Sequence, residues 1–197
     1  MNIFYLHSDP KMCAEYHVDR HVVSQIKEYA QLLSTAHRLI DGKQSVALSK
    51  SGRRQQVWTL DDSEMEQIIY KATHVNHPSA IWCRQSNNNY NWLFCHFEGL
   101  LKEYTYRYGR THLTIDKLGD ILKDTPENIE QSKVMTKMPS CMDKQYIVSL
   151  DPITNYRNYY NYGKTDLLRW SNRPPPQWID GTIIMTDGKK QIYTIQR

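Results

Sequence analysis

Cysteines are few in this sequence, and no two of them are close together. The four are spread over 197 residues: Cys13, Cys83, Cys95 and Cys141. Zinc knuckles and redox-active dithiols are built from closely spaced pairs such as CxxC, so this spacing argues against both kinds of site. We therefore expect reduced thiols, as in a protein of a reducing compartment.

Long apolar runs and targeting signals are also missing. No stretch approaches the roughly 18 apolar residues of a membrane span, and the first residues lack the basic and apolar segments of a signal peptide. Internal repeats and low-complexity tracts are absent as well. We predict a soluble, cytoplasmic protein that has no membrane among its partners.

The chain that remains is mildly basic and rich in aromatic residues. Its net charge of +4 and pI near 8.8 permit a nucleic-acid partner without requiring one. Fourteen tyrosines and five tryptophans suit base stacking and ordinary packing alike. The length fits one domain with a small addition.

Helical signals extend over most of the chain. Asp9 and Pro10 are typical of a helix start, and apolar residues then recur every three or four positions to about residue 40, where Asp41-Gly42 ends the pattern. Similar signals predict further helices at 62–71, from 78 to about 108 with a break or restart at 87–89, at 114–122, and from 151 to about 169.

Strand signals are confined to two places. Segments 45–48 and 56–60 can pair around Ser51-Gly52, and 182–195 alternates apolar and polar residues around Asp187-Gly188. The fold class we predict is mainly α, a compact helical domain with small β-hairpin additions. Residues 1–180 would form the single helical domain, with loop insertions at 43–63 and 124–146, and residues 181–197 a C-terminal β-hairpin appendage.

Ionisable side chains crowd onto the first predicted helix. His17 and His21 are four residues apart and Glu28 lies seven beyond, so the three share a face. Asp19 lies about 200° from the two histidines in helical projection. Such a group indicates a catalytic or anion-binding site. The alternative is a packing seam in which the histidines are hydrogen-bonded polar residues.

A second group comes just before the helix predicted at Pro78. His74, Asn76 and His77 would lie at the positive end of that helix, which favours phosphate, and Arg84 follows about two turns later. The alternative is a capped turn in which Asn76 or His77 satisfies main-chain N–H groups.

Aromatic and basic residues also alternate later in the chain. Arg107 stands among tyrosines, as does Lys164, and such mixtures suit phosphate contacts combined with base stacking. Tyr90, Trp92 and Trp178 are the candidate stacking residues. Helix-packed aromatic residues are an equally good interpretation.

A metal site is a competing interpretation of the histidines. Its ligands would come from two histidines of the first helix, one later histidine and a carboxylate: His17, His21, His74 or His77, and Asp19 or Glu28. The glutamate of an H-E-x-x-H motif is missing, as is the adjacent His-Asp pair of HD-type hydrolases. We therefore predict neither a metal nor a cofactor.

Several short segments carry a resemblance to a known family. They are the opening at 1–8, Ala14-Glu15-Tyr16, Asn76-His77-Pro78, segment 103–109 with 115–118, and segment 159–164. In this order they resemble segments of the pyrimidine-dimer DNA glycosylases of the endonuclease V type. The whole chain also resembles a group of small phage proteins without an assigned activity.

The resemblance implies a compact helical fold and a glycosylase with an abasic-lyase step. In that family the N-terminal α-amine attacks the sugar C1′, a helix carboxylate assists, and basic residues grip phosphates. An α-amine has a pKa of about 7.7–8.0, so much of it is a free nucleophile near neutral pH. The implied partner is DNA, and for a phage protein the location is the host cytoplasm.

Three features depart from the family pattern. Aligned on segment 14–16, the family's catalytic glutamate falls on Val18, one residue before Asp19. The neighbouring family arginines become His17 and His21. Met1 precedes Asn2 here, so the α-amine of either residue is the candidate nucleophile.

These observations together predict a DNA-repair enzyme, a DNA glycosylase and abasic lyase. The candidate catalytic residues are Asp19, His17, His21, Glu28, Met1 and Asn2. The candidate DNA-binding residues are His74, Asn76, His77, Arg84, Tyr90, Trp92, Arg107, Lys164 and Trp178. Two alternatives stay open: a metal-dependent nucleotide phosphohydrolase that uses the histidines, and a non-catalytic phage protein that binds DNA or a host factor.

Overall fold

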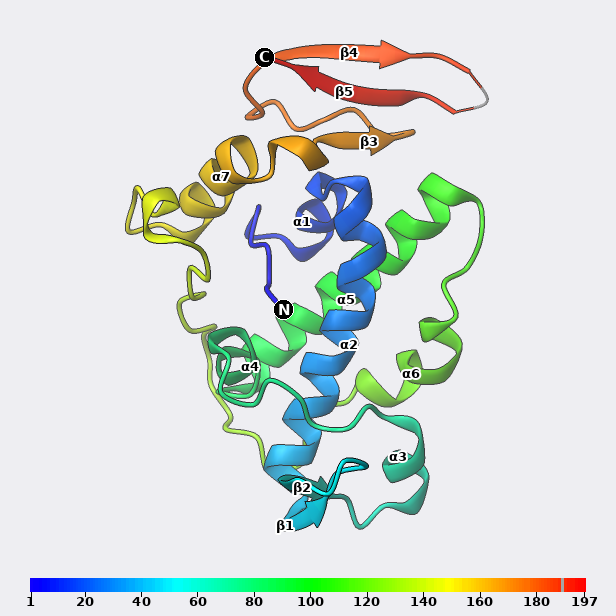
Figure 1. The fold of residues 1–197 in the computed structure, drawn as a ribbon, viewed down its shortest axis with the longest axis vertical. Coiled ribbons are helices and arrows are strands. Elements are labelled where there is room, and N and C mark those ends of the chain that lie inside the picture. Colours follow the sequence, from blue (N-terminus) through cyan, green and yellow to red (C-terminus); the bar gives the residue numbers. More distant parts are fainter. Residues whose placement is uncertain (189) are drawn as a thin grey trace. The chain divides into compact units, whose positions relative to one another are not determined.

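The computed structural model describes residues 1–188 and 190–197, and within them the side chains of all but residues 115–117 (Figure 1). Helices form 46% of the chain and strands 13%, in two small antiparallel sheets. This is a mixed α/β composition with helices as the main element, and the prediction of a mainly helical chain is confirmed in that coarser sense. Among the described residues, no helix is both long and apolar enough to cross a membrane.

The chain divides into two compact units, each assembled from distant segments. Unit 1 comprises residue 1 with 27–94 and 113–136, and unit 2 comprises residues 2–26, 95–112 and 137–197. Two long helices, α2 (Asp19–Asp41) and α5 (Asn87–Tyr108), contribute residues to both units. The C-terminal segment from residue 181 belongs to unit 2 together with the residues before it.

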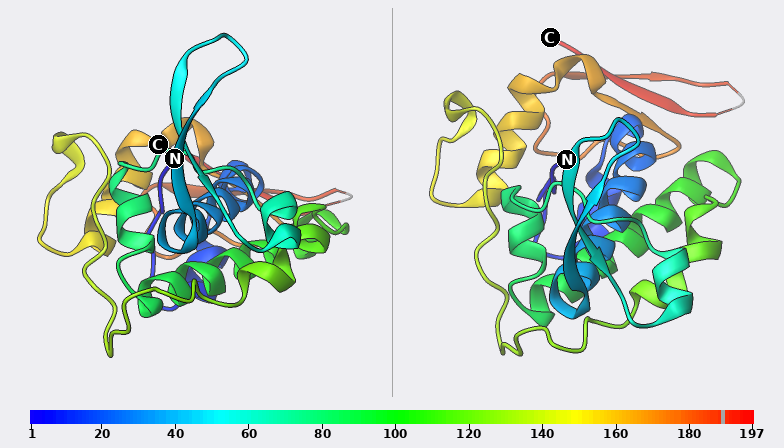
Figure 2. Two further views of the ribbon diagram at one scale, coloured as in Figure 1. Left: turned by 90° about the horizontal axis from the view of Figure 1, so that it is seen from below. Right: turned by 60° about the horizontal axis from the view of Figure 1, so that its bottom comes forward.

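Unit 1 consists of helices and one hairpin. Besides its parts of α2 and α5 it contains β1 (Lys43–Leu48), β2 (Arg54–Thr59), α3 (Ser63–Ile68), α4 (Pro78–Cys83) and α6 (Thr114–Leu122). The predicted hairpin, the helix at 114–122 and the restart near Asn87 are confirmed. β1 and β2 pair antiparallel from Lys43 opposite Thr59 to Leu48 opposite Arg54, and Figure 2 shows this hairpin extending away from the end of α2.

One buried arginine joins the hairpin and α3 to α2. The guanidinium of Arg38 donates to the main-chain oxygens of Trp58, Glu66, Ile69 and Tyr70 at 2.6–3.1 Å, and to the Glu66 carboxylate. An arginine has five N–H donors, and these five bonds use them all. The strands are mostly exposed, so this anchor rather than a core of their own fixes the hairpin to unit 1.

Unit 2 combines an extended N-terminal arm, helices and a small sheet. Its elements besides parts of α2 and α5 are α1 (Pro10–Tyr16), η1 (Lys144–Tyr146), α7 (Pro152–Gly163), η2 (Thr165–Leu167), β3 (Arg169–Ser171), β4 (Thr182–Thr186) and β5 (Ile192–Gln196). The arm buries Ile3 and Leu6 completely. Asp9 and Asp151 cap α1 and α7, each followed by proline at the first helical position, as predicted.

The prediction of one continuous helix from Asp9 to residue 40 is wrong. α1 ends at Tyr16, His17 is an extended cap residue, and α2 begins at Asp19. In an unbroken helix the His17 carbonyl would accept from the N–H four residues on. Here Arg107 donates to that oxygen at 2.8 Å, while His21 N–H donates to Val18. His17 therefore does not share a helix face with His21 and Glu28.

The helix after Asp151 is shorter than predicted. α7 ends at Gly163, and Arg169 begins a strand instead of lying on the helix. β5 pairs with both neighbours in the order β3-β5-β4, and Trp170 lies opposite Tyr193. The predicted C-terminal hairpin is present, and its strand β5 also holds β3, which explains why the chain leaves the helix before residue 169.

Candidate functional site

The α-amine of Met1 lies beside a helix carboxylate in unit 1. Its nitrogen is 3.7 Å from Oε2 of Glu28, on α2, and the Glu28 side chain is 30% exposed. Opposite charges at this separation attract each other, most strongly where water is partly excluded. The pair thus places a nucleophilic amine and a proton acceptor next to each other.

His77 belongs to the same group of charges. Burial lowers the pKa of His77, the positive charges of the Met1 amine and His74 lower it further, and Glu28 acts in the opposite direction. The imidazole is therefore neutral at pH 7. Its Nδ1 accepts a hydrogen bond from the main-chain N–H of Ser79 at 3.1 Å, so the predicted capped turn is confirmed for His77.

We name this set, the Met1 amine with Glu28 and His77, the amine site. It contains one amine, one carboxylate and one neutral imidazole. An amine attacks carbon only after losing a proton, and the Glu28 carboxylate can accept it. The neutral His77 ring uses its lone pair at Nδ1 for Ser79 N–H, so its Nε2 carries a proton and is a donor. Two of its members were predicted as catalytic residues and the third as a DNA-binding residue, but the sequence did not predict that they would meet.

Other predicted DNA-binding residues of unit 1 differ in accessibility. His74 and Asn76 are exposed, and His74 has a positive φ of 49°. Arg84 is half-buried, and its Nη1 is buried without a hydrogen-bond partner among the described residues. Burial also lowers the pKa of Arg84. Trp92 is half-buried with its ring edge-on to that of Trp82, at 6.1 Å between centroids.

Tyr90 lies in the core of unit 1. It is completely buried, its hydroxyl donates to the Leu122 carbonyl at 2.9 Å, and the same hydroxyl bonds to Nε2 of His37. A ring in this position packs against protein and is not available to a base in this structure.

In unit 2, a group of buried histidines surrounds the junction of α1 and α2. His17 and His96 are 0% exposed, with ring centroids 4.9 Å apart. His21 stacks on Phe4 at 4.1 Å, and its Nδ1 bonds to the Tyr160 hydroxyl at 2.6 Å. Burial lowers the pKa of all three histidines, to about 3 for His21 and about 4 for His96, and well below the usual value for His17. They are neutral at pH 7.

Asp19 is held in a network of hydrogen bonds and ion pairs. Its carboxylate accepts from Arg107 at 3.1 Å and from the main-chain N–H and hydroxyl of Ser171 at 2.9 and 2.7 Å. Arg107 is 0% exposed and also donates to Glu103 at 2.9 Å. The structure thus places Asp19 and Arg107 in an interior network that ties α2, α5 and β3 together, and this position favours a structural role for both.

The remaining predicted residues of unit 2 make local contacts. Asn2 donates to the Cys141 carbonyl and accepts from the Tyr156 hydroxyl, which fixes the start of the arm. Lys164 lies 4.8 Å from the centre of the Tyr159 ring. Trp178 packs near Tyr16, and its buried Nε1 has no hydrogen-bond partner in the part of the chain that the structure describes.

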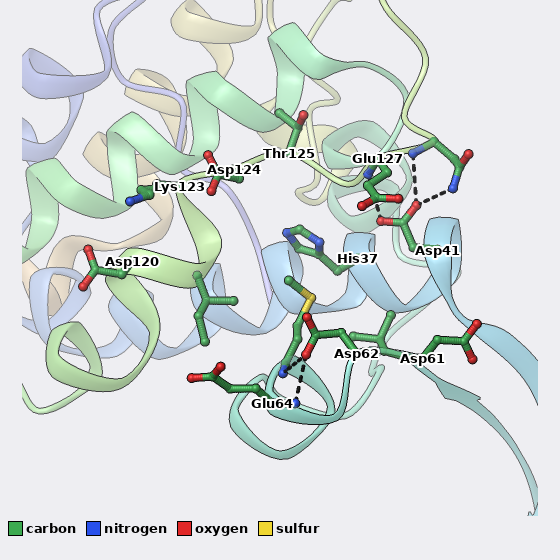
Figure 3. Close-up of a pocket in the computed structure, with 14 residues that line it drawn as sticks. His37, Asp41, Asp61, Asp62, Glu64, Asp120, Lys123, Asp124, Thr125 and Glu127 are labelled. Atoms are coloured by element: carbon green, nitrogen blue, oxygen red, sulfur yellow. Dashed lines mark hydrogen bonds between the residues drawn. The ribbon is translucent and has the colours of Figure 1, made fainter.

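An acidic pocket in unit 1 was not predicted from the sequence. It has a volume of about 650 Å³ and is lined by His37, Lys123 and seven carboxylates: Asp41, Asp61, Asp62, Glu64, Asp120, Asp124 and Glu127. Figure 3 shows the carboxylates on several sides of His37. Asp41 and Asp62 are engaged by main-chain N–H groups, and Asp61 pairs with Lys43. Such walls repel phosphates, so this pocket is not a place for a nucleic-acid backbone.

Two further residues join the buried histidines and were also missed. Cys13 and His96 contribute, with His17, one potential ligand atom each to a cluster in which all these atoms lie within 4.8 Å of one another. The i, i+4 spacing of Cys13 and His17 was the available signal. His96 lies 79 positions from His17 in the numbering, and no local pattern connects the two.

No family model matches this chain, and no curated protein or solved structure is significantly similar to it. The functional interpretation therefore depends on the residues and their geometry.

Proposed function

We propose that this protein is a DNA glycosylase with abasic-lyase activity, and that the α-amine of Met1 is its nucleophile. The observation that carries the proposal is the 3.7 Å approach of this amine to Glu28. The resemblance of short segments to the pyrimidine-dimer glycosylases supports it, because that family uses an N-terminal amine and a helix carboxylate. Glu28 takes the carboxylate role here, since Asp19 is engaged by Arg107 and Ser171.

The chemistry follows from the three groups of the amine site. The deprotonated amine attacks the sugar C1′, the bond from C1′ to the base breaks, and the base leaves with the electron pair and takes up a proton. The bound nitrogen loses one proton, its lone pair then breaks the C1′–O4′ bond, and O4′ takes up a proton as the sugar ring opens, which gives a protonated imine to C1′. Removal of a proton from C2′ breaks the C3′–O bond and releases the phosphate. Glu28 is the proton acceptor and its carboxylate also stabilises the cationic imine, while the neutral His77, whose Nδ1 is engaged by Ser79 N–H, offers its Nε2–H as a hydrogen-bond donor.

The DNA contacts we propose come from unit 1 side chains outside the core. Arg84 is half-buried, and His74 and Asn76 are exposed on the segment that leads to His77. The accessible part of the Arg84 guanidinium would contact a phosphate. The net charge of +4 favours a polyanion in general.

The alternative of a nucleotide phosphohydrolase has weaker support. A hydrolytic metal needs an open position that the substrate can reach. Cys13, His17 and His96 are all 0% exposed. A non-catalytic protein that binds DNA or a host factor is the outcome to expect if the amine proves inert.

The test is covalent trapping on DNA. We expect the protein, in EDTA, to form a borohydride-stabilised adduct with duplex DNA that carries an abasic site or a pyrimidine dimer, because borohydride reduces the imine to a stable amine. Intact-mass measurement first establishes which residue carries the free amine. Selective acetylation of that amine should abolish the adduct. If the protein binds these duplexes but forms an adduct with neither, the proposal of DNA binding stands and the proposal of lyase activity is excluded.

Glu28→Gln should slow adduct formation by about 100-fold or more, because general acid–base partners contribute 10²–10⁴-fold. The substitution keeps the size of the side chain and removes the proton acceptor. Glu98→Gln, at an exposed position of α5, is the matched control and should trap at the wild-type rate. Equal rates for the two variants would remove Glu28 from the mechanism.

A further inference from the structure

We propose that Cys13, His17 and His96 bind a zinc ion within unit 2. One ligand atom from each residue lies within 4.8 Å of the other two, and all three residues are 0% exposed. Cys13 comes from α1, His17 is the cap residue of that helix, and His96 comes from α5. The site is separate from the amine site and does not depend on the proposed function.

The two imidazoles are oriented as metal ligands usually are. Nδ1 of His17 lies 2.7 Å from the Cys13 carbonyl oxygen, and Nδ1 of His96 lies 2.9 Å from the Pro10 carbonyl oxygen. A carbonyl only accepts, so each Nδ1 carries the proton and each neutral ring has its lone pair on Nε2. Metal-bound histidines typically donate the other ring N–H to a carbonyl or carboxylate in this way.

One of these lone pairs is conspicuous. Nε2 of His17 is buried and has no hydrogen-bond partner in the described part of the chain. Buried polar atoms nearly always have a partner, and an orphaned one points to a bound group. His21 does not belong to the group of ligand atoms that lie within 4.8 Å of one another.

The sulfur of Cys13 also has a suitable environment. Its thiol donates to the Phe4 carbonyl at 3.2 Å and accepts from the Leu6 main-chain N–H at the same distance. When the thiol loses its proton to bind a metal, the Leu6 N–H is already directed at the sulfur and stabilises the thiolate. The metal would thereby connect the arm, α1 and α5.

The ligand set selects the ion. One thiolate and two imidazoles suit Zn²⁺, and with no carboxylate among the three, Mg²⁺ and Ca²⁺ are poorly served. The positive charge of the Arg107 guanidinium contributes to the lowered pKa of His17. This charge is compensated at the metal site, because Arg107 is paired with the carboxylates of Asp19 and Glu103. Full burial leaves no access for a substrate of nucleotide size, and the role we infer is structural.

Cobalt substitution tests the site on the full chain. We expect one Co²⁺ per protein, a thiolate-to-cobalt charge-transfer band with the visible bands of a tetrahedral ion, and displacement by one equivalent of Zn²⁺. Binding should release about one proton per ion at pH 7, because the thiol must ionise while two imidazoles bind in neutral form. Zn²⁺ should also raise the melting temperature of the protein.

Variants show whether these residues are the ligands. Cys13→Ser should lose the charge-transfer band, whereas Cys83→Ser, at an equally buried cysteine of unit 1, should keep it. If Cys13→Ser does not fold, X-ray absorption of the wild-type zinc protein decides, with one sulfur expected at about 2.3 Å and nitrogens at about 2.0–2.1 Å. No stoichiometric binding, a shell of oxygen and nitrogen alone, or a band that survives Cys13→Ser would overturn the proposal.

Discussion

Replacing Arg107 with methionine is expected to destabilise the protein by about 3–5 kcal/mol, the usual cost of removing one partner from a buried ion pair. Arg107 is 0% exposed and donates to Asp19, to Glu103 and to the carbonyls of His17 and Glu15. Methionine fills much of the same volume and donates nothing, so it leaves two carboxylates without this cation and two buried carbonyls without a donor. Urea unfolding followed by tryptophan fluorescence measures the loss.

The controls for this prediction come from the same helix end and the same network. Arg110→Met removes an exposed cation two residues beyond α5 and should change stability by no more than about 0.5 kcal/mol. Asp19→Asn combined with Arg107→Met should cost less than the sum of the two single changes, because both substitutions remove the same Asp19–Arg107 ion pair. A loss below about 1 kcal/mol for Arg107→Met would show that the network contributes little.

Acid should destabilise the metal-free protein well before its carboxylates are protonated. His17, His21 and His96 have folded-state pKa values below the unfolded value of about 6.5, at about 3 for His21 and about 4 for His96. Above pH 6.5 the three are neutral in both states and contribute no pH dependence. As the pH falls from 6.5 towards 4, the unfolded chain binds protons that the folded protein does not bind, so the free energy of unfolding decreases.

The slope of that decrease is the measurable quantity. The three protons of these histidines correspond to about 4 kcal/mol per pH unit at most, and the lowered pKa values of His37, His77 and His112 add to this slope. Unfolding free energies in EDTA between pH 7 and pH 5 measure the total. His21→Gln should reduce the slope by about one proton, whereas His74→Gln, at an exposed histidine, should leave it unchanged. A flat profile over this range would show that the histidines take up protons equally in the folded and the unfolded protein.

The elements that the sequence predicted are those with local causes. Asp9 and Asp151 each precede a proline and each cap a helix, because a carboxylate and the following N–H groups are close together in the chain. The hairpin around Ser51-Gly52 has a similarly local signal. The break at His17 has a remote cause, since its carbonyl is taken by Arg107, and no periodicity within the first helix reveals that partner.

The sequence also predicted only part of the candidate site. Glu28 and Met1 were recognisable as candidates from their residue types and from the family resemblance. Their meeting with His77 depends on how α2 and the segment before α4 pack in unit 1, and a single sequence does not contain that information in a readable form. Asp19 is a counterexample. The sequence predicted a catalytic role for it, but in the structure its carboxylate accepts hydrogen bonds from Arg107 and Ser171.

The attachment of the β1-β2 hairpin has a consequence for variation and engineering. Arg38 holds the chain near the end of the hairpin, within α3 and just after it, through the main-chain oxygens of Trp58, Glu66, Ile69 and Tyr70. Main-chain oxygens are the same whatever side chains the hairpin carries, so the anchor places almost no demand on its sequence. The exposed turn at residues 49–53 can therefore be lengthened, tagged or exchanged for a foreign peptide while the rest of unit 1 keeps its fold.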